Sequence, residues 1–400
     1  MLARCAPKPF LFTVPSPCFV LDYANFSKNL KILERLEERT KVKILLALKA
    51  FACWHLFPML SRAFQGPLWG TCASSLHEAR LGREEFGGEV HCFACAYSED
   101  EIRGLIDVCD HVVFNSIAQW RRFRPFIIEA WDQGKKLRCG MRINPEHSEG
   151  APLIYNPCAP NSRLGVRAKD FVPQVFAEGI TGLHFHTLCE QNAQALKATL
   201  EAFEAKFGSY IHKCQWLNFG GGHHLTRADY DLELLVQMLL AWQKRYNVEI
   251  YLEPGEAVAL DCGWLTATVL DIVQAEKAIA ILDVSPTCHM PDTLEMPYDP
   301  PVFYLHKDVV TEATQNSSAP YEYLLAGKSC LAGDVLKATY GFQSPLKIGT
   351  RLIFGDMAIY SMVKTTTFNG LNLPSIGVFQ DQDFRLLRSF GYSDFKSRLG

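Results

Sequence analysis

The chain has 400 residues, a hydrophobic content of 48%, a charged content of 21% and a formal net charge of −3. Near-neutral charge without a run of Lys or Arg argues against nucleic acid and anionic membranes as partners. The longest apolar stretches, such as Lys43–Leu48, are too short to cross a bilayer. The first residues lack the apolar segment of a signal peptide, so the 14 cysteines are expected as reduced thiols of a cytoplasmic protein.

The chain up to Glu256 alternates short apolar runs with amphipathic segments. After a helix expected at Tyr23–Leu36, the expected strands are Ile44–Leu48, Leu68–Cys72, Val90–Ala94, His111–Phe114, Leu137–Ile143, Ile180–His186, Gln215–Phe219 and Val248–Leu252. The helices expected between them are Ser75–Phe86, Ser98–Cys109, Ile117–Trp131, Asn192–Phe207 and Ala228–Tyr246. Strands that alternate with helices predict parallel βα units, and eight such strands predict an α/β fold of the (β/α)8 barrel type.

The sequence after Glu256 has a different character, with short strand-like runs separated by Gly, Pro and Asn. They are Ala278–Val284, Tyr321–Ala326, Val335–Tyr340, Arg351–Phe354, Met362–Phe368 and Ser375–Phe379. This pattern is typical of a mostly antiparallel β domain. Pro9–Asp22 contains a further strand-like run that is a candidate for the same sheet. We therefore expect a barrel of residues 16–256, and a β-sandwich or β-barrel-like domain of residues 257–400 with an N-terminal strand in 1–15.

Four features fall at the carboxyl ends of expected barrel strands, where the active sites of such barrels assemble. They are Lys49, His186, Gly220–Gly222 and Glu253. Lys49 is either a lysine whose stem covers apolar surface or a desolvated amine able to form a Schiff base. Three consecutive glycines before a helix are either a plain turn or a loop of backbone N–H groups suited to a phosphate.

Two histidines and one glutamate leave several chemistries open. His184 and His186 share one face of a strand, which suits either a metal pair or one buried and one functional histidine. Glu253 suits a general base, a metal ligand or the partner of a protonated pyridine nitrogen. These residues together favour pyridoxal 5′-phosphate as the cofactor: the lysine suits its aldehyde, the glycines its phosphate, a histidine its ring and the acid its ring nitrogen. No metal is expected.

Several longer motifs at these positions resemble one enzyme family. They are Ala47-Leu48-Lys49-Ala50, Cys72-Ala73-Ser74, Leu183-His184-Phe185-His186, Asn218-Phe219-Gly220-Gly221-Gly222-His223-His224, Glu253-Pro254-Gly255-Glu256-Ala257, Cys288-His289-Met290-Pro291-Asp292, Cys330-Leu331-Ala332-Gly333-Asp334 and Gly355-Asp356-Met357. Over nearly the whole chain the sequence resembles the fold-type III pyridoxal-phosphate decarboxylases, the alanine racemase-like group that contains the ornithine, diaminopimelate and arginine enzymes. Within it, the resemblance is to the branch that decarboxylates carboxynorspermidine or carboxyspermidine in spermidine biosynthesis.

The resemblance implies a role for each matched residue. Lys49 would carry the cofactor as a Schiff base, His186 would stack on its ring, and Glu253 would pair with the ring nitrogen. The remaining implied cofactor residues are Gly221 and Gly222 at the phosphate, Tyr360 in the phosphate pocket, and Arg142, which would order the site. Cys330 would reach the active site of a neighbouring subunit, which implies a homodimer with shared active sites.

Two departures from the family pattern affect charge. Where the ornithine and diaminopimelate branches resemble Glu-Pro-Gly-Arg, this chain has Glu256, so an arginine expected near the phosphate is missing. Cys330 is followed by Leu331 rather than by an acid, which leaves Glu256, Asp292 and Asp334 as candidates to bind the distal amines of a polyamine substrate.

Three rival functions remain beside the polyamine decarboxylase. One is a diaminopimelate or other basic amino-acid decarboxylase of the same fold, against which the missing arginine counts. Another is a metal-dependent barrel hydrolase that uses His184 and His186, in which the three glycines would have no function. The last is a non-catalytic regulator, against which the presence of both Lys49 and Cys330 counts.

Overall fold

The computed structural model describes residues 6–149, 155–316, 319–381 and 383–400. The chain divides into two compact units. The first is Asn29–Val258, and the second combines Met1–Lys28 with Ala259–Gly400. None of the helices in the described ranges is long and apolar enough to span a membrane.

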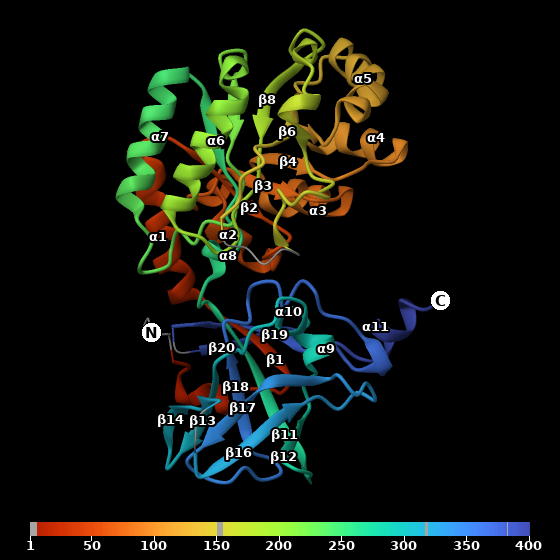
Figure 1. Ribbon diagram of the computed structural model, residues 1–400. Coiled ribbons are helices and arrows are strands. Elements are labelled where there is room, and N and C mark those ends of the chain that lie inside the picture. The colour runs from red at the N-terminus through yellow and green to blue at the C-terminus, as the bar shows by residue number, and fades with distance from the viewer. Residues whose placement is uncertain (1–5, 150–154, 317–318, 382) are drawn as a thin grey trace. The chain divides into compact units, whose positions relative to one another are not determined.

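The Asn29–Val258 unit contains a closed barrel of parallel strands (Figure 1). The strands run in the order β5-β4-β3-β2-β10-β9-β8-β6, and pairing of β5 with β6 closes the ring. Their bounds are β2 (Lys43–Ala47), β3 (Gly70–Ala73), β4 (Glu89–Phe93), β5 (His111–Phe114), β6 (Arg138–Asn144), β8 (Ile180–His184), β9 (Trp216–Asn218) and β10 (Glu249–Leu252). The two-residue strand β7 (Val166–Arg167) adds to β6 without joining the ring. The expected (β/α)8 barrel is confirmed.

Helices surround this barrel (Figure 1). They are α1 (Tyr23–Thr40), α2 (Phe57–Leu60), α3 (Leu76–Leu81), α4 (Glu99–Val108), α5 (Ile117–Asp132), α6 (Ala193–Ile211), α7 (Leu232–Tyr246) and α8 (Glu256–Ala259). A π-helical turn, Gly82–Phe86, continues α3. Serines cap two of these helices: Ser75 Oγ accepts a hydrogen bond from Glu78 N at the start of α3, and Ser98 and Glu101 form a reciprocal capping box at the start of α4.

Trp216 fills the middle of the barrel. Its indole packs in a buried cluster with Leu45, Val113 and Tyr251. The neighbouring strands make room for it with glycine, since a Cβ on Gly182 would lie 2.1 Å from Trp216 Cε2 and one on Gly140 would lie 2.4 Å from Cη2. The barrel interior is therefore a packed core, and only its ends are available for chemistry.

The second unit is built on a mixed, mostly antiparallel sheet (Figure 1). Its strands are β1 (Cys18–Asp22), β11 (Gly263–Gln274), β12 (Ala278–Leu282), β13 (Val302–His306), β14 (Val309–Glu312), β15 (Thr314–Gln315), β16 (Tyr321–Ala326), β17 (Val335–Phe342), β18 (Arg351–Gly355), β19 (Ser375–Gln380) and β20 (Asp383–Arg388). Its short helices are α9 (Pro286–His289), α10 (Asp292–Glu295) and α11 (Tyr392–Ser397). The expected C-terminal β domain is confirmed as a fold class.

Two details of this unit differ from the sequence-based expectation. β1 lies within the range 16–256 assigned to the barrel, but it pairs with β11 and β19 of the second unit, which confirms the strand-like run in Pro9–Asp22 as part of that sheet. The prediction of a strand at Met362–Phe368 is wrong, because these residues form turns that lead into the 3-10 helix Phe368–Gly370. Tyr360, two residues earlier, has a φ of +48°, which turns the chain out of extended geometry.

Candidate active site

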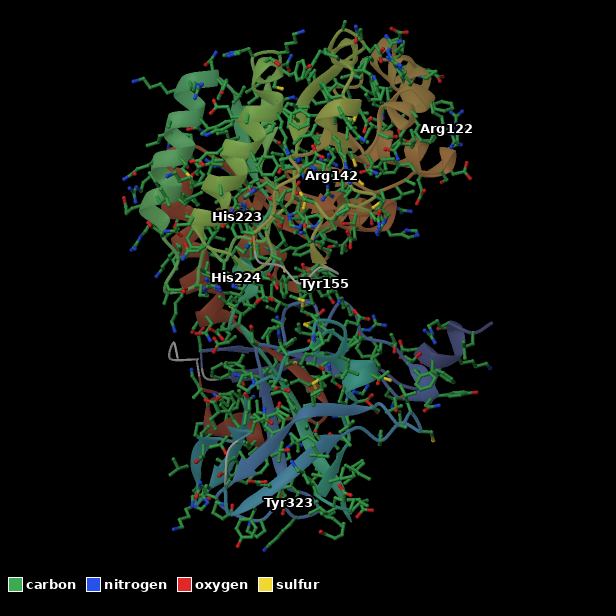
Figure 2. All side chains as sticks on the ribbon, in the orientation of Figure 1. Arg122, Arg142, Tyr155, His223, His224 and Tyr323 are labelled. Atoms are coloured by element: carbon green, nitrogen blue, oxygen red, sulfur yellow. The ribbon has the colours of Figure 1, made fainter. Side chains whose placement is uncertain are left out.

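Four of the expected site residues lie at the carboxyl ends of barrel strands. Lys49 follows β2, Arg142 lies near the end of β6, His186 follows β8 and Glu253 follows β10 directly. Because the strands are parallel, these ends meet at one mouth of the barrel. Figure 2 labels Arg142 within this unit.

Lys49 and His186 are neighbours at this mouth. Lys49 Nζ lies 3.5 Å from His186 Nε2, and His186 Nδ1 accepts a hydrogen bond from Gly221 N at 3.0 Å. Since Nδ1 accepts, a neutral imidazole carries its proton on Nε2, on the side of the lysine. Burial lowers the pKa of His186 well below its usual value, and the charges of Lys49 and Arg142 add to this effect. The ring is therefore neutral and fixed in orientation.

Glu253 is a largely buried carboxylate with a partner on each oxygen. Asn218 Nδ2 donates to Oε1 at 2.7 Å, and His184 Nε2 lies 3.2 Å from Oε2. Burial raises the pKa of Glu253, but attraction to His184 and the hydrogen bonds from His184 and Asn218 outweigh it and lower the pKa to about 2. The carboxylate is thus ionised and positioned by side chains of β9 and β8.

Arg142 supports the histidine rather than presenting a free cation. Its guanidinium donates to the carbonyl oxygen of His186 at 3.1 Å and lies 4.4 Å from the ring centroid of Phe93. Burial lowers the pKa of Arg142 to about 10, a value at which the group stays charged at neutral pH. This placement agrees with the ordering role that the family resemblance implies.

The glycine loop requires glycine at every position. A Cβ would lie 2.4 Å from Phe185 O on Gly220, 2.2 Å from Glu253 O on Gly221 and 2.0 Å from Leu188 O on Gly222. Gly220 N donates to Asn218 Oδ1 at 2.8 Å, as Gly221 N does to His186, so these two amides fix side chains of the site. Within the described ranges, the amides of Gly222 and of His223 donate to no other group.

Glu256, expected as a substrate residue, is already paired. His224 Nε2 lies 3.0 Å from Glu256 Oε2, and both side chains are largely buried. His223 and His224, which follow the glycine loop, are labelled in Figure 2. The pair joins the loop after β9 to the loop after β10.

Cys330 and Asp334 lie together in the second unit, between β16 and β17. The Cys330 thiol is exposed, and its backbone N–H donates to Asn369 Oδ1 at 2.9 Å. Asp334 is buried and accepts hydrogen bonds from Ser285 Oγ at 2.8 Å, Thr287 N at 2.9 Å and Ser329 Oγ at 2.6 Å. Asp334 therefore shapes the loop that presents Cys330.

Tyr360 and Asp292 lie around one lysine of the same unit. Lys364 Nζ lies 2.5 Å from Asp292 Oδ1, 2.8 Å from Glu295 Oε2 and 5.5 Å from the centre of the Tyr360 ring. Burial lowers the pKa of Lys364, but the hydrogen bonds and charges of the two carboxylates outweigh it and raise the pKa. Asp292 is thus engaged by a cation of its own unit.

The described residues contain one group with the composition of a metal site, formed by Glu89, His91 and His111. It lies on β4 and β5, at the opposite end of the barrel from Lys49. The two imidazoles are stacked with centroids 3.9 Å apart and planes 11° apart, so their in-plane lone pairs do not converge on one ion. Lys43 Nζ already neutralises Glu89 at 2.6 Å. His184 and His186, the pair considered for a metal, instead bind Glu253 and Gly221.

Three residues of the mouth were not anticipated in these roles. Asn218 and His184 hold Glu253, and their inward alternation with Trp216 and Gly182 on β9 and β8 was the available signal. Cys72, at the end of β3, lies under the influence of Glu253, since burial and that carboxylate raise the pKa of its thiol well above the usual value.

These features fit pyridoxal phosphate. Lys49 offers an amine, Glu253 an ionised carboxylate, and the loop from Gly220 to His223 has a cradle in which any Cβ would clash and two amides remain free. A buried carboxylate favours a protonated pyridine nitrogen, and free amides favour a phosphate.

Comparison with known proteins gives the same assignment. The sequence family described as "Pyridoxal-dependent decarboxylase, C-terminal sheet domain" matches residues 18–358. A carboxyaminopropylagmatine decarboxylase of Synechocystis is 43% identical, over 98% of this chain and 97% of the relative. A carboxynorspermidine/carboxyspermidine decarboxylase of Campylobacter jejuni is 40% identical, over 97% of this chain and 100% of the relative.

Solved structures agree with the sequence relatives. A crystal structure of carboxynorspermidine decarboxylase from Campylobacter jejuni, complexed with norspermidine, has a TM-score of 0.83 at 38% identity and covers 96% of this chain and 100% of its own. Diaminopimelate decarboxylase from Helicobacter pylori, with a TM-score of 0.79 at 17% identity over 98% of each chain, shares the fold. The chain belongs to the pyridoxal-dependent decarboxylases, and it is a carboxy-lyase that uses pyridoxal 5′-phosphate.

Proposed function

We propose that this chain decarboxylates carboxynorspermidine, carboxyspermidine or both, in the biosynthesis of norspermidine and spermidine. The observation that carries the proposal is the 40% identity to the Campylobacter jejuni enzyme of that activity, which extends over 97% of this chain. The diaminopimelate decarboxylases among the relatives are only 22–23% identical over 62–65% of the chain, so the diaminopimelate alternative is not favoured.

The residues at the barrel mouth divide the work of holding the cofactor. Lys49 would hold its aldehyde carbon covalently, the neutral ring of His186 would cover one face, and Glu253 would keep a proton on the ring nitrogen. Pyridoxal phosphate, when bound, provides the electron sink for the pair of electrons that carbon dioxide leaves on the substrate α-carbon. Glu253 sustains that sink because it is ionised and cannot turn away from Asn218 and His184.

The loop from Gly220 to His223 would take the phosphate. Gly222 and His223 offer the free amides, whereas Gly221 contributes mainly by lacking a side chain, because its own amide serves His186. We assign Tyr360 to the same pocket on the family resemblance.

Cys330 would return the proton to the α-carbon. We propose that it does so in the active site of a second copy of the chain, which makes the enzyme a homodimer with shared sites. Its exposed thiol, presented on a loop fixed by Asp334, supports this role. Asp334 acts as a positioning residue, and the pairing of Asp292 with Lys364 and of Glu256 with His224 means that neither carboxylate is free to bind a substrate amine unaided.

A complementation experiment tests the shared site. Lys49→Ala and Cys330→Ala should each be strongly impaired, and mixing them under subunit exchange should restore activity. Random pairing makes half the dimers mixed, each with one intact site of two, so recovery should approach about a quarter of the parent activity. If exchange is demonstrated and activity stays at the level of the separate variants, the site lies within one chain.

A second substrate has specific support. The Synechocystis relative, a carboxyaminopropylagmatine decarboxylase, is 43% identical to this chain. That substrate ends in a guanidinium, which prefers a bidentate carboxylate, whereas a terminal ammonium is a point charge. A difference of one methylene, by contrast, is worth only about 1–3 kcal/mol in a pocket.

Steady-state comparison of carboxynorspermidine, carboxyspermidine, carboxyaminopropylagmatine and diaminopimelate decides between the candidates. We expect kcat/KM to be highest for one of the first two. A kcat/KM for carboxyaminopropylagmatine that exceeds both would replace the first proposal by the second, and a preference for diaminopimelate would overturn both.

We also propose that the enzyme works in the cytoplasm. The cysteines of the described residues are all free thiols, including the exposed Cys330. Reduced thiols in an enzyme of this size are typical of a reducing compartment.

A further inference from the structure

The loop that would hold the phosphate lies beside a carboxylate. Glu256 follows the loop after β10, and its Oε2 lies 3.0 Å from His224 Nε2, two residues beyond Gly222. An unpaired carboxylate next to a phosphate dianion is unfavourable, because like charges repel most strongly where water is excluded. The buried pair with His224 is therefore an unusual element for a phosphate site.

The pair is built into the same set of loops as the glycines. His224 N donates to Gln191 O at 3.2 Å, and Gln191 N donates to Gly222 O at 3.0 Å. On the other side, Thr226 Oγ1 donates to Ala257 O at 2.6 Å, next to Glu256. Consecutive hydrogen bonds thus connect His224 to Gly222 through one residue and hold the loops after β8, β9 and β10 together.

The His224 side chain is buried against Glu256 and keeps one nitrogen without a partner among the described residues. Both its side chain and that of Glu256 are largely buried, with 7% and 14% exposure, so water screens neither of them well. His224 Nδ1 is buried and has no hydrogen-bond partner among the described residues, which leaves one polar atom of the ring available. A histidine that places one nitrogen on a carboxylate keeps a second nitrogen, and once protonated at both it carries a charge opposite to that of the carboxylate.

We propose that protonated His224 neutralises Glu256, so that no uncompensated carboxylate lies beside the Gly222 loop when the loop accepts the phosphate dianion. This inference rests on the proposed phosphate-binding role of that loop. It predicts that the pair controls binding of the phosphate specifically, rather than the shape of the loop. It also predicts that removing His224 weakens the affinity for phosphate and that removing the charge of Glu256 cancels this effect.

Binding of pyridoxal phosphate and of pyridoxal to the apoenzyme tests this, with absorbance as the readout and inorganic phosphate as a competitor. His224→Gln should weaken the binding of pyridoxal phosphate by on the order of tenfold or more, about 1.4 kcal/mol, because the Glu256 charge is then uncompensated. Glu256→Gln should leave the affinity equal or tighter. The double variant should recover most of the loss, and pyridoxal, which lacks the phosphate, should respond to none of the changes.

Matched controls are available at Glu201 on α6 and at His212, which directly follows this helix, because Glu201→Gln and His212→Gln change exposed residues of the same types. Equal loss of pyridoxal and pyridoxal phosphate affinity in His224→Gln would show a structural role for the loop and overturn the inference. Failure of the double variant to recover would also overturn it. Failure of the parent apoenzyme to bind pyridoxal phosphate or inorganic phosphate would instead refute the phosphate role of the loop. The failure of the proposed role and the failure of the inference about His224 and Glu256 can therefore be told apart.

Discussion

The carboxylate of Glu253 is held by the two strands that follow one another on one side of β10, by Asn218 Nδ2 of β9 at 2.7 Å and by His184 Nε2 of β8 at 3.2 Å. His184 is itself buried, and burial lowers its pKa, although the nearby Glu253 opposes the change. His184 donates its Nε2–H to Glu253. Glu253 is thereby ionised and immobile before any ligand arrives, so binding need not reorganise it.

Glu253→Gln should reduce turnover far more than it reduces cofactor affinity. An amide cannot keep a proton on the ring nitrogen, whereas Lys49 and the glycine loop are unchanged. We expect kcat to fall by on the order of 100-fold or more, with pyridoxal phosphate still bound. Steady-state kinetics and cofactor titration check this, and a kcat within a few-fold of the parent would remove Glu253 from its proposed role.

Borohydride treatment of the purified holoenzyme should attach the cofactor to Lys49 alone. Lys43, which begins the strand β2 that Lys49 follows, is bound to Glu89 at 2.6 Å; it serves as an internal control and should stay unmodified. Mass spectrometry of the digested protein locates the adduct. An adduct on another lysine, or its persistence in Lys49→Arg, would contradict the assignment.

Gly182→Ala should destabilise the barrel. The new Cβ would lie 2.1 Å from Trp216 Cε2, in a core where neither the strand nor the indole has room to move. We expect a loss of about 3 kcal/mol in the free energy of unfolding. Gly208→Ala is the matched control, since its Cβ meets only Glu204 Cγ at 3.5 Å on helix α6, and it should stabilise by about 0.5–1 kcal/mol.

Thermal unfolding of both glycine variants measures the difference. The expected order of Tm is Gly208→Ala, parent, Gly182→Ala. A Gly182→Ala protein with the parent Tm would mean that Trp216 is not packed against β8.

Asp334→Ala should destabilise the second unit, whereas Asp292→Ala should not. Asp334 is buried and satisfies Ser285, Thr287 and Ser329, so its removal leaves buried donors unpaired, at a cost of about 2–4 kcal/mol. Asp292 forms a part-exposed ion pair with Lys364, which is worth about 0–1 kcal/mol. Thermal unfolding separates these outcomes. A stable Asp334→Asn variant whose only defect is a raised KM would instead favour substrate binding by Asp334.

The barrel was predictable because each of its strands is an apolar run between helices with recognisable caps. β5 at His111–Phe114 agrees with the expected bounds, and Ser98 caps α4 as its spacing indicates. β11, at Gly263–Gln274, was not recognised, because its second half is mostly exposed and loses the apolar signal of a strand. The wrongly predicted strand at Met362–Phe368 is the opposite case, because apolar and β-branched residues gave the signal of a strand where the chain forms turns.

The positions of several side chains at the barrel mouth were predictable, but the contacts between them were not. Strand ends indicated Lys49, His186 and Glu253, whereas the partners of Glu253 depend on the register between β8, β9 and β10, which no local pattern encodes. The pairing of Glu256 with His224 is of the same kind, because it connects two loops that are 32 positions apart.

The position of β1 bears on how the chain is made. Residues 18–22 are synthesised long before their partners Gly263–Thr266 and Ser375–Phe379. The barrel, Asn29–Val258, can fold while later residues are still being translated, whereas the sheet of the second unit needs β1 to pair with strands that are made after the barrel. The apolar strand Cys18–Asp22 therefore stays unpaired until β11 emerges, and it lacks its parallel neighbour until β19 follows. Slow translation or truncation before β19 should therefore favour aggregation through this strand, and synthesis of β19 should end that exposure.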